Sequence, residues 1–180
     1  MSGASATSLA LKFLKVTKQS LECYVILSES AKIVALKERG EDIKKSIEEL
    51  GVKVYDESEI WAGVASGSFG IDAMAVIPTS MNTLAKIAYG LSDDLISRCA
   101  SVMLKERKTL LLAPREMPYS PIALENMSKL ASLGVIIAPP ILGYYSGGES
   151  LESMENFLVG KWLDVLGIEN EIYERWRDEK

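Results

Sequence analysis

Several short polar segments of the sequence follow apolar runs that are typical of buried strands, and their residue types could bind a phosphorylated ligand. Ser28-Glu29-Ser30-Ala31 follows one such run, and Pro78-Thr79-Ser80-Met81-Asn82-Thr83 follows another. Near the start, Ser2-Gly3-Ala4-Ser5 precedes a helical pattern, and its small residues would let peptide N–H groups approach an anion at the helix N-terminus. Each segment alone could equally be an ordinary helix N-cap.

A further segment carries charge in a constrained turn. Pro114-Arg115-Glu116-Met117-Pro118 follows an apolar run and places an arginine and a glutamate between two prolines. Ion pairs on a surface are common and contribute little. A rigid turn that holds both charges at the end of a strand nevertheless favours a binding site, and together with the hydroxyl-rich segments it indicates a phosphorylated ligand.

The composition limits the chemistry that the chain can perform. The 180 residues include no histidine, which excludes Ser-His-Asp triads, Cys-His dyads and metal sites built on histidine. Cys23 and Cys99 lie far apart and form no metal-binding motif, so we expect no metal. Catalysis would have to use carboxylates, Lys, Arg, Tyr, Ser, peptide amides or a cofactor.

The charge and the hydropathy argue against two classes of partner. The net charge is −5 and no basic stripe is present, which argues against a nucleic-acid partner. The longest apolar runs fall well short of the roughly 20 residues that a transmembrane helix needs, so we expect no membrane span. Two scattered cysteines are typical of a cytoplasmic protein.

Strands that alternate with helices would bring the polar segments together. Nearly continuous apolar runs predict strands at 23–27, 73–77, 109–113 and 135–138. Helical patterns occupy 6–18, 41–50, 80–89, 94–107, 121–133 and 151–166, and a further helix runs from Ser28 to Glu38. This order predicts an α/β fold with a doubly wound parallel sheet in a single domain, 1–180, whose ligand lies beyond the carboxyl ends of the strands.

The first loop raises a question about the start of the chain. In a doubly wound fold a loop such as Ser2-Gly3-Ala4-Ser5 follows a strand, but no strand precedes it here. Either the sheet lacks its first strand, or the true start lies upstream and Met1 is an internal methionine. We expect the second, because loss of a central strand would expose two neighbouring edges.

The sequence resembles the UbiX-type flavin prenyltransferases, formerly described as aromatic acid decarboxylases, over most of its length. The motifs that carry the resemblance are Leu104-Lys105-Glu106-Arg107, Pro114-Arg115-Glu116-Met117-Pro118, Leu124-Glu125-Asn126-Met127, Ala65-Ser66-Gly67-Ser68 and Leu166-Gly167-Ile168. Each motif is weak alone, but the set is specific in its spacing.

The resemblance implies a flavodoxin-like or Rossmann-like three-layer sandwich that assembles as a homo-oligomer, a dodecamer in that family. It implies a metal-independent transfer of a dimethylallyl group from dimethylallyl phosphate to N5 and C6 of reduced FMN. The product, prenylated FMN, would serve a partner UbiD-type decarboxylase. Whether the donor is the phosphate or the pyrophosphate is left open.

The resemblance also implies roles for individual residues. The FMN site would be lined by Gly3, Ala4, Ser5, Ser28, Ser80, Met81, Asn82, Thr83 and Arg115. The prenyl phosphate would be bound by Arg98, Lys105, Tyr145 and Lys161, and covered by Trp176 of a C-terminal tail, 168–180. The catalytic residues would be Glu116, Glu38, Ser5 and Lys105.

Two positions depart from the family pattern. Ala6 stands where the family usually has glycine, and we expect it to need only ordinary helical backbone. Lys161 stands where many members have arginine, which keeps the charge but loses the bidentate fork. Among rival functions, the related cysteine-decarboxylating flavoproteins rely by resemblance on a histidine that this chain lacks. An FMN-binding carrier and a direct aromatic acid decarboxylase subunit stay open as alternatives.

Overall fold

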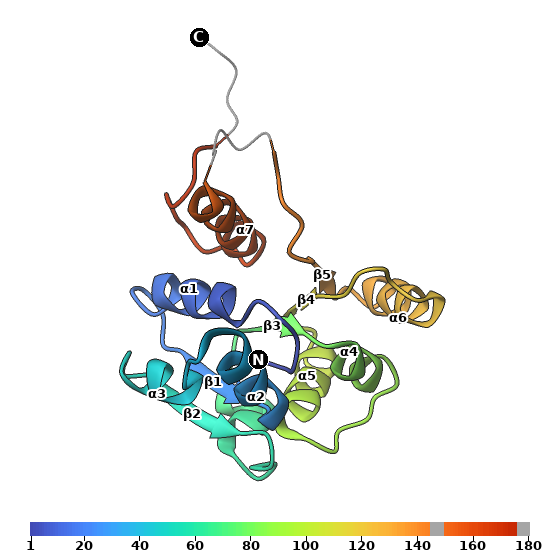
Figure 1. The fold of residues 1–180 in the computed structure, drawn as a ribbon. Coiled ribbons are helices and arrows are strands. Elements are labelled where there is room, and N and C mark those ends of the chain that lie inside the picture. The colour runs from blue at the N-terminus through green and yellow to red at the C-terminus, as the bar shows by residue number, and fades with distance from the viewer. Residues whose placement is uncertain (145–149, 176–180) are drawn as a thin grey trace. The chain divides into compact units, whose positions relative to one another are not determined.

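The computed structural model describes residues 1–144 and 150–175. The chain forms two compact units, Met1–Pro139 and Pro140–Lys180. The described part of the first unit contains five strands and the helices α1 to α6, and that of the second contains α7 (Figure 1). The expectation of a single domain with a tail from residue 168 stays a prediction.

Helices and strands alternate along the first unit, as the sequence predicts. In chain order its elements are α1 (Thr7–Thr17), β1 (Tyr24–Leu27), α2 (Glu29–Arg39), α3 (Ile43–Glu48), β2 (Lys53–Asp56), η1 (Gly63–Ala65), η2 (Gly67–Phe69), β3 (Ala73–Thr79), α4 (Met81–Ala88), α5 (Leu95–Lys105), β4 (Thr109–Pro114), α6 (Pro121–Ser132) and β5 (Ile136–Ile137). Each strand pair among the described residues is parallel. The α/β class is therefore confirmed.

The strands form two pieces of sheet rather than one continuous sheet. One piece is β1–β2 and the other has the order β3–β4–β5. The sequence analysis did not identify β2, because this four-residue strand has an exposed lysine at its start and only Tyr55 is buried. Long buried strands such as β4 leave a clearer apolar signal.

Met1 and Ser2 connect the two pieces of sheet at their carboxyl ends. The amino group of Met1 donates to the carbonyl oxygen of Ile26 in β1 at 2.7 Å, and the Ser28 N–H donates to the Met1 carbonyl at 3.2 Å. On the other side, the Ser2 N–H donates to the carbonyl of Pro78 in β3 at 3.2 Å. Met1 and Ser2 thus bond to both β1 and β3 at the ends of these strands.

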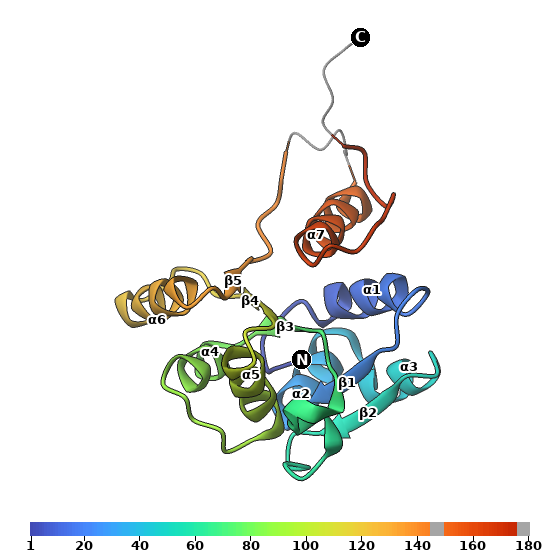
Figure 2. The same cartoon turned by 180° about the vertical axis from the view of Figure 1, so that it is seen from behind.

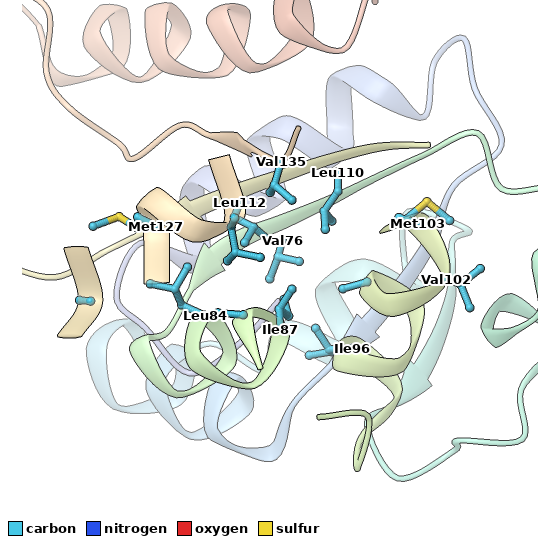
Figure 3. Packing of buried hydrophobic residues seen from close by; sticks show 14 residues of the cluster. Val76, Leu84, Ile87, Ile96, Val102, Met103, Leu110, Leu112, Met127 and Val135 are labelled. Carbon is cyan, nitrogen blue, oxygen red and sulfur yellow. The ribbon is translucent and has the colours of Figure 1, made fainter. Parts of the chain in front are cut away.

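Helices cover both faces of the sheet in the first unit. Figures 1 and 2 show α1 and α5 on opposite sides of β3. Figure 3 shows the larger core, in which Val76, Leu110 and Leu112 of the strands pack against the apolar faces of the helices. A second core lies between α1, β1 and α3, and includes Leu14 and Ile47. These two cores hold the ends of the strands in fixed positions.

The second unit is built on α7 (Leu151–Val165), which begins at its N-cap Ser150. Gly167 has a φ of 72°, a left-handed conformation that suits glycine, and the chain reverses direction there. The Ile168 N–H donates to the carbonyl of Leu163 at 2.9 Å and closes this turn. Across the described residues, no helix is both long enough and apolar enough to cross a membrane.

Candidate functional site

The N-terminus of α1 differs from that of every other described α-helix. The six others each begin at a residue whose side chain accepts a hydrogen bond from the first turn, namely Ser28, Asp42, Ser80, Asp94, Ser120 and Ser150. The N-cap of α1 is Ala6, which has no such side chain, and its first turn contains no acidic residue. The peptide N–H groups and the positive end of the dipole are therefore available to an anion.

The loop before α1 lies against the first turn of α2. A Cβ atom at Gly3 would overlap the Cβ of Ser30 and come within 3.3 Å of its Cα, so glycine is required there. The hydroxyl of Ser2 donates to the Pro78 carbonyl at 3.1 Å and accepts from the Ser80 N–H at 2.8 Å. The predicted FMN residues Gly3, Ala4 and Ser5 thus lie in a loop that is fixed from both sides.

Ala6 corrects one expectation from the sequence. Its φ of 80° and ψ of 34° are left-handed, not ordinary helical. This conformation disfavours residues with a Cβ by roughly 1–2 kcal/mol, which explains why glycine suits the position. The next residue, Thr7, is fully buried, and its hydroxyl has no hydrogen-bond partner among the described residues. Strain and an unsatisfied hydroxyl therefore coincide at the uncapped helix end.

Ser28 and Ser80 occupy the positions that the sequence predicts, at the ends of β1 and β3. The Ser28 hydroxyl accepts from the Ala31 N–H at 3.0 Å, and the Ser80 hydroxyl accepts from the Thr83 N–H at 3.3 Å. Both hydroxyls therefore act as N-caps. In α4, Met81 is half-buried, Asn82 is exposed and Thr83 is buried.

Thr79 is a positioning residue that the sequence analysis did not single out. Thr79 is fully buried, and its hydroxyl donates to the Val76 carbonyl at 2.6 Å. The same hydroxyl oxygen, Oγ1 of Thr79, accepts from the Ala113 N–H at 3.1 Å. Its own carbonyl accepts from the Arg115 N–H at 3.1 Å. A buried threonine at the end of a strand is the only sequence signal for this role. It fixes Arg115 beside the start of α4.

Arg115 and Glu116 lie side by side in sequence but do not pair. The part of the chain that the structure describes contains no ion pair between them, and the Glu116 carboxylate instead accepts from the Met117 N–H at 3.0 Å. Both side chains are exposed. The Tyr119 hydroxyl donates to the Pro114 carbonyl at 3.0 Å and closes the turn. This turn leaves the arginine and the carboxylate available to ligands.

We call the segments 2–6, 28–30, 79–83 and 114–119 the carboxyl edge, because they follow the ends of the parallel strands or join them. Hydrogen bonds or close contacts link each segment to another. The expectation that these loops gather at one edge of the sheet is therefore confirmed.

Two predicted site residues, Lys105 and Glu38, lie elsewhere. Lys105 ends α5, four residues before β4 begins, and Glu38 lies in the last turn of α2, far from Ser28. Arg98 is exposed near the start of α5, where the Leu95 N–H donates to the carbonyl of Glu57, the residue that follows β2, at 2.7 Å, so Arg98 is not placed with these two. Since the six-residue β4 spans about 20 Å, Lys105 and Arg115 lie at opposite ends of this strand. Within one copy of the first unit, Lys105 and Glu38 are thus remote from the carboxyl edge.

Two of the sequence motifs meet at this opposite end, which we call the amino edge and define by Glu38, residues 66–68 and residues 105–106. The Lys105 ammonium binds the Glu106 carboxylate, which lowers the pKa of Glu106. A Cβ at Gly67 would overlap the Glu106 side chain. The motif 65–68 and the motif 104–107 therefore form one charged surface cluster, away from the carboxyl edge.

The remaining predicted residues fall in the second unit or outside the described residues. Lys161 is exposed on α7. Tyr145 and Trp176 lie outside the described residues. No group of three or more His, Cys, Asp or Glu residues within 1–144 and 150–175 could hold a metal ion.

Comparisons with known proteins identify close relatives. The family model "Flavoprotein" matches residues 1–158. Flavin prenyltransferase UbiX of Helicobacter pylori is 52% identical over 178 residues, which cover 98% of this chain and 95% of the relative. The match extends across both units, so the two units are shared with this relative.

Two solved structures have the same fold. A crystal structure of AnUbiX with FMN and dimethylallyl pyrophosphate superposes with a TM-score of 0.94 and 36% identity, covering 100% of this chain and 96% of the other. A dodecameric FMN-dependent UbiX-like decarboxylase from Escherichia coli gives a TM-score of 0.90 and 34% identity, with 98% and 100% coverage. The α/β fold is thus shared over the full length.

Proposed function

The chain belongs to the flavoprotein family and, within it, to the UbiX flavin prenyltransferases, and from this premise we propose that it transfers a dimethylallyl group to reduced FMN. It is an enzyme of the prenyltransferase class. When bound, reduced FMN supplies the nucleophilic N5 and C6 atoms that accept the prenyl group. The residues of the chain must bind the flavin phosphate, bind the prenyl phosphate and move protons.

The uncapped start of α1 is the observation that carries this proposal. The Gly3–Ala6 loop, the free helix end and the unsatisfied Thr7 hydroxyl fit a phosphate group, because peptide N–H groups and the helix dipole both favour an anion there. The chain places no carboxylate of its own in the first turn of α1. The FMN phosphate is the ligand that this arrangement fits.

The other residues of the carboxyl edge surround this phosphate position. The loop before α1 contacts Ser30 and Ser80. These contacts place Ser28 on one side of the loop and the start of α4, from Ser80 to Thr83, on the other. Arg115 extends from the adjoining turn and would hold the flavin. Glu116 is the neighbouring carboxylate, exposed and unpaired with Arg115, and we assign it the transfer of a proton during the reaction.

The prenyl phosphate requires cations, since charge builds on it as the allylic C–O bond breaks. Lys161, Lys105 and Arg98 are the proposed cations, Tyr145 is a further phosphate ligand, and Trp176 would shelter the allylic cation through its ring. Glu38 is the second proposed carboxylate.

Because the two edges are far apart within one chain, a second chain would have to supply some of the residues of the active site. Lys105 and Glu38 cannot reach Arg115 of the same chain if each keeps its place at the other end of the sheet. We therefore infer a homo-oligomer in which a neighbouring copy brings its amino edge to the carboxyl edge. The dodecameric relative supports such an assembly. Light scattering that shows a 19.7 kDa monomer at working concentration would refute it.

We further propose that the product serves a UbiD-type decarboxylase and that the enzyme works in the cytoplasm. A reducing compartment fits the two free cysteines, of which Cys99 is buried and Cys23 is half-buried. The donor is dimethylallyl phosphate or its pyrophosphate.

The direct test is to mix the protein with reduced FMN and dimethylallyl phosphate and to measure the mass of the flavin. We expect a gain of one five-carbon prenyl unit and release of inorganic phosphate. Flavin that binds but gains no mass would identify an FMN-binding carrier. Release of carbon dioxide from an aromatic acid by the protein alone would instead identify a direct decarboxylase.

A further inference from the structure

Asp164, in the last turn of α7, accepts hydrogen bonds from three side chains of the segment that follows the helix. One carboxylate oxygen accepts from Asn170 Nδ2 at 2.9 Å and Arg175 Nη2 at 2.7 Å. The other accepts from Arg175 Nη1 at 2.9 Å and from the Tyr173 hydroxyl. These bonds, with that of Arg175 first, lower the pKa of Asp164 to about 2. The carboxylate is therefore charged and fully occupied at neutral pH.

A second contact fixes the register of the same segment on α7. The ring of Tyr173 lies over Gly160, where any Cβ would overlap it. It packs edge-on against Phe157, with the ring centroids 5.5 Å apart, and the Arg175 guanidinium lies 5.1 Å from its centroid. Residues 170–175 are thus held at two points that are four residues apart on the helix.

These contacts place the segment on the same face of α7 as Lys161. Residues 157, 160, 161 and 164 have the spacing i, i+3, i+4 and i+7, which lines one face of a helix. Lys161 and Asp164 are also three residues apart, a spacing at which a lysine and an aspartate ordinarily pair. Because Arg175, Tyr173 and Asn170 occupy Asp164, no ion pair joins it to Lys161 in the described part of the chain. Lys161 stays exposed.

We propose that Asp164 is a positioning residue for the prenyl phosphate site: its bonds to Arg175, Tyr173 and Asn170 hold the C-terminal segment beside Lys161 and keep this lysine available for the phosphate. The inference rests on the proposed function, in which Lys161 binds that phosphate. Arg175 has two effects in this arrangement. It attaches the segment to α7, and it neutralises the carboxylate that would otherwise compete for Lys161.

The test compares Asp164→Asn and Arg175→Met with Glu169→Gln, a control that removes one charge from an exposed position of the same segment. We expect each of the first two variants to raise the KM for dimethylallyl phosphate roughly 10- to 100-fold, because a small displacement of a binding group has effects of that size. The Kd for FMN should stay within about twofold, as should both constants of the control. Trypsin should cleave after Arg175 faster in Asp164→Asn than in the parent.

Arg175→Met keeps α7 unchanged, so it provides a test even if Asp164→Asn folds poorly. A KM within about twofold of the parent in Arg175→Met would overturn the proposal, even if the segment became easier to cleave, because Asp164 would then be purely structural. Equal losses of FMN affinity and of prenyl phosphate affinity would overturn it as well. A parent protein that makes no prenylated flavin refutes the proposed function itself. Faster cleavage of Asp164→Asn would then show only that Asp164 holds the segment 170–175 on α7, without a role in prenyl transfer.

Discussion

The carboxyl edge and the amino edge of the first unit both contain polar residues, but these residues are held in different ways. At the carboxyl edge, the hydroxyls of Ser2 and Thr79 bond to backbone groups of neighbouring segments, and both residues are buried. At the amino edge, Lys105 and Glu106 bind mainly each other, and their side chains are 60% and 39% exposed. We therefore expect the carboxyl edge, rather than the amino edge, to bind a ligand within a single chain.

The difference indicates that the two edges have different roles. Rigid backbone donors suit a ligand that must be oriented precisely, as the flavin must be before its prenylation. Exposed charges on flexible stems suit a surface that becomes ordered when another chain covers it. The electrostatic attraction between an Arg or Lys at such a surface and a phosphate becomes stronger when water is excluded from around the pair.

The largest expected effect tests the catalytic role of the carboxyl edge. Glu116→Gln should keep the turn, because glutamine retains an acceptor for the Met117 N–H, but should slow prenyl transfer roughly 10²- to 10⁴-fold if Glu116 moves a proton. Single-turnover prenylation with FMN in excess measures this rate. Glu48→Gln, an exposed carboxylate on α3, is the control. A rate within about twofold of the parent would exclude the proton-transfer role.

The next prediction tests whether the two edges come from different chains. Lys105→Met and Glu116→Gln should each be nearly inactive alone. If one chain supplies Lys105 and its neighbour supplies Glu116, co-expressed mixed oligomers should regain roughly a quarter of the parent activity, since a quarter of the sites then have both native residues. Mixed oligomers as inactive as the single variants would show that both residues act from the same chain.

Replacing a glycine by alanine should change FMN affinity more at the carboxyl edge than at the amino edge. Gly3→Ala places a Cβ against Cβ, Cα and backbone C of Ser30, which cannot yield easily, so FMN affinity should fall about 10- to 100-fold. Gly67→Ala meets Oε1, Cδ and Cγ of Glu106, which belong to a flexible side chain that can rotate away. Its FMN affinity should match the parent. Titration of flavin fluorescence measures both, and equal losses would contradict the distinction between the edges.

The smallest effect concerns stability at the carboxyl edge. Ala6→Gly removes the penalty of a left-handed alanine, so it should raise the free energy of unfolding by about 1 kcal/mol. Denaturant unfolding of the parent and the variant measures the difference. Ala10→Gly, within α1, is the opposite control and should destabilise by roughly 1 kcal/mol. Destabilisation by both variants would show that the loop does not strain Ala6.

Much of the fold could be predicted from sequence because its signals are local. A serine before a helical pattern predicted the starts of α2 and α4, and the continuous apolar run of β4 predicted that strand. The two-residue β5 lies inside a longer predicted run. The strand β2 was missed because its exposed flank and short length produce no apolar run.

The candidate site was predictable in its location but not in its details. The expectation for Ala6 was wrong because its left-handed backbone is imposed by the contacts of the loop, not by its own residue type. Sequence spacing also cannot show that Lys105 and Arg115, ten residues apart, lie at opposite ends of one strand rather than in one site. The role of Thr79 depends on Ala113 in another strand, and that of Asp164 on a segment that folds back onto α7, so the spacing of residues alone could not establish either role.

Thr79 has a consequence for the motions of the molecule. Its buried hydroxyl and its carbonyl engage the N–H groups of Ala113 and Arg115, so the main chain at Arg115 is held to the sheet although its side chain lies on the surface. In deuterated water, both amides should exchange as slowly as those of the core strands. If Arg115 binds the flavin as proposed, its guanidinium would adjust by side-chain rotation around a fixed Cα while the flavin ring changes shape on prenylation.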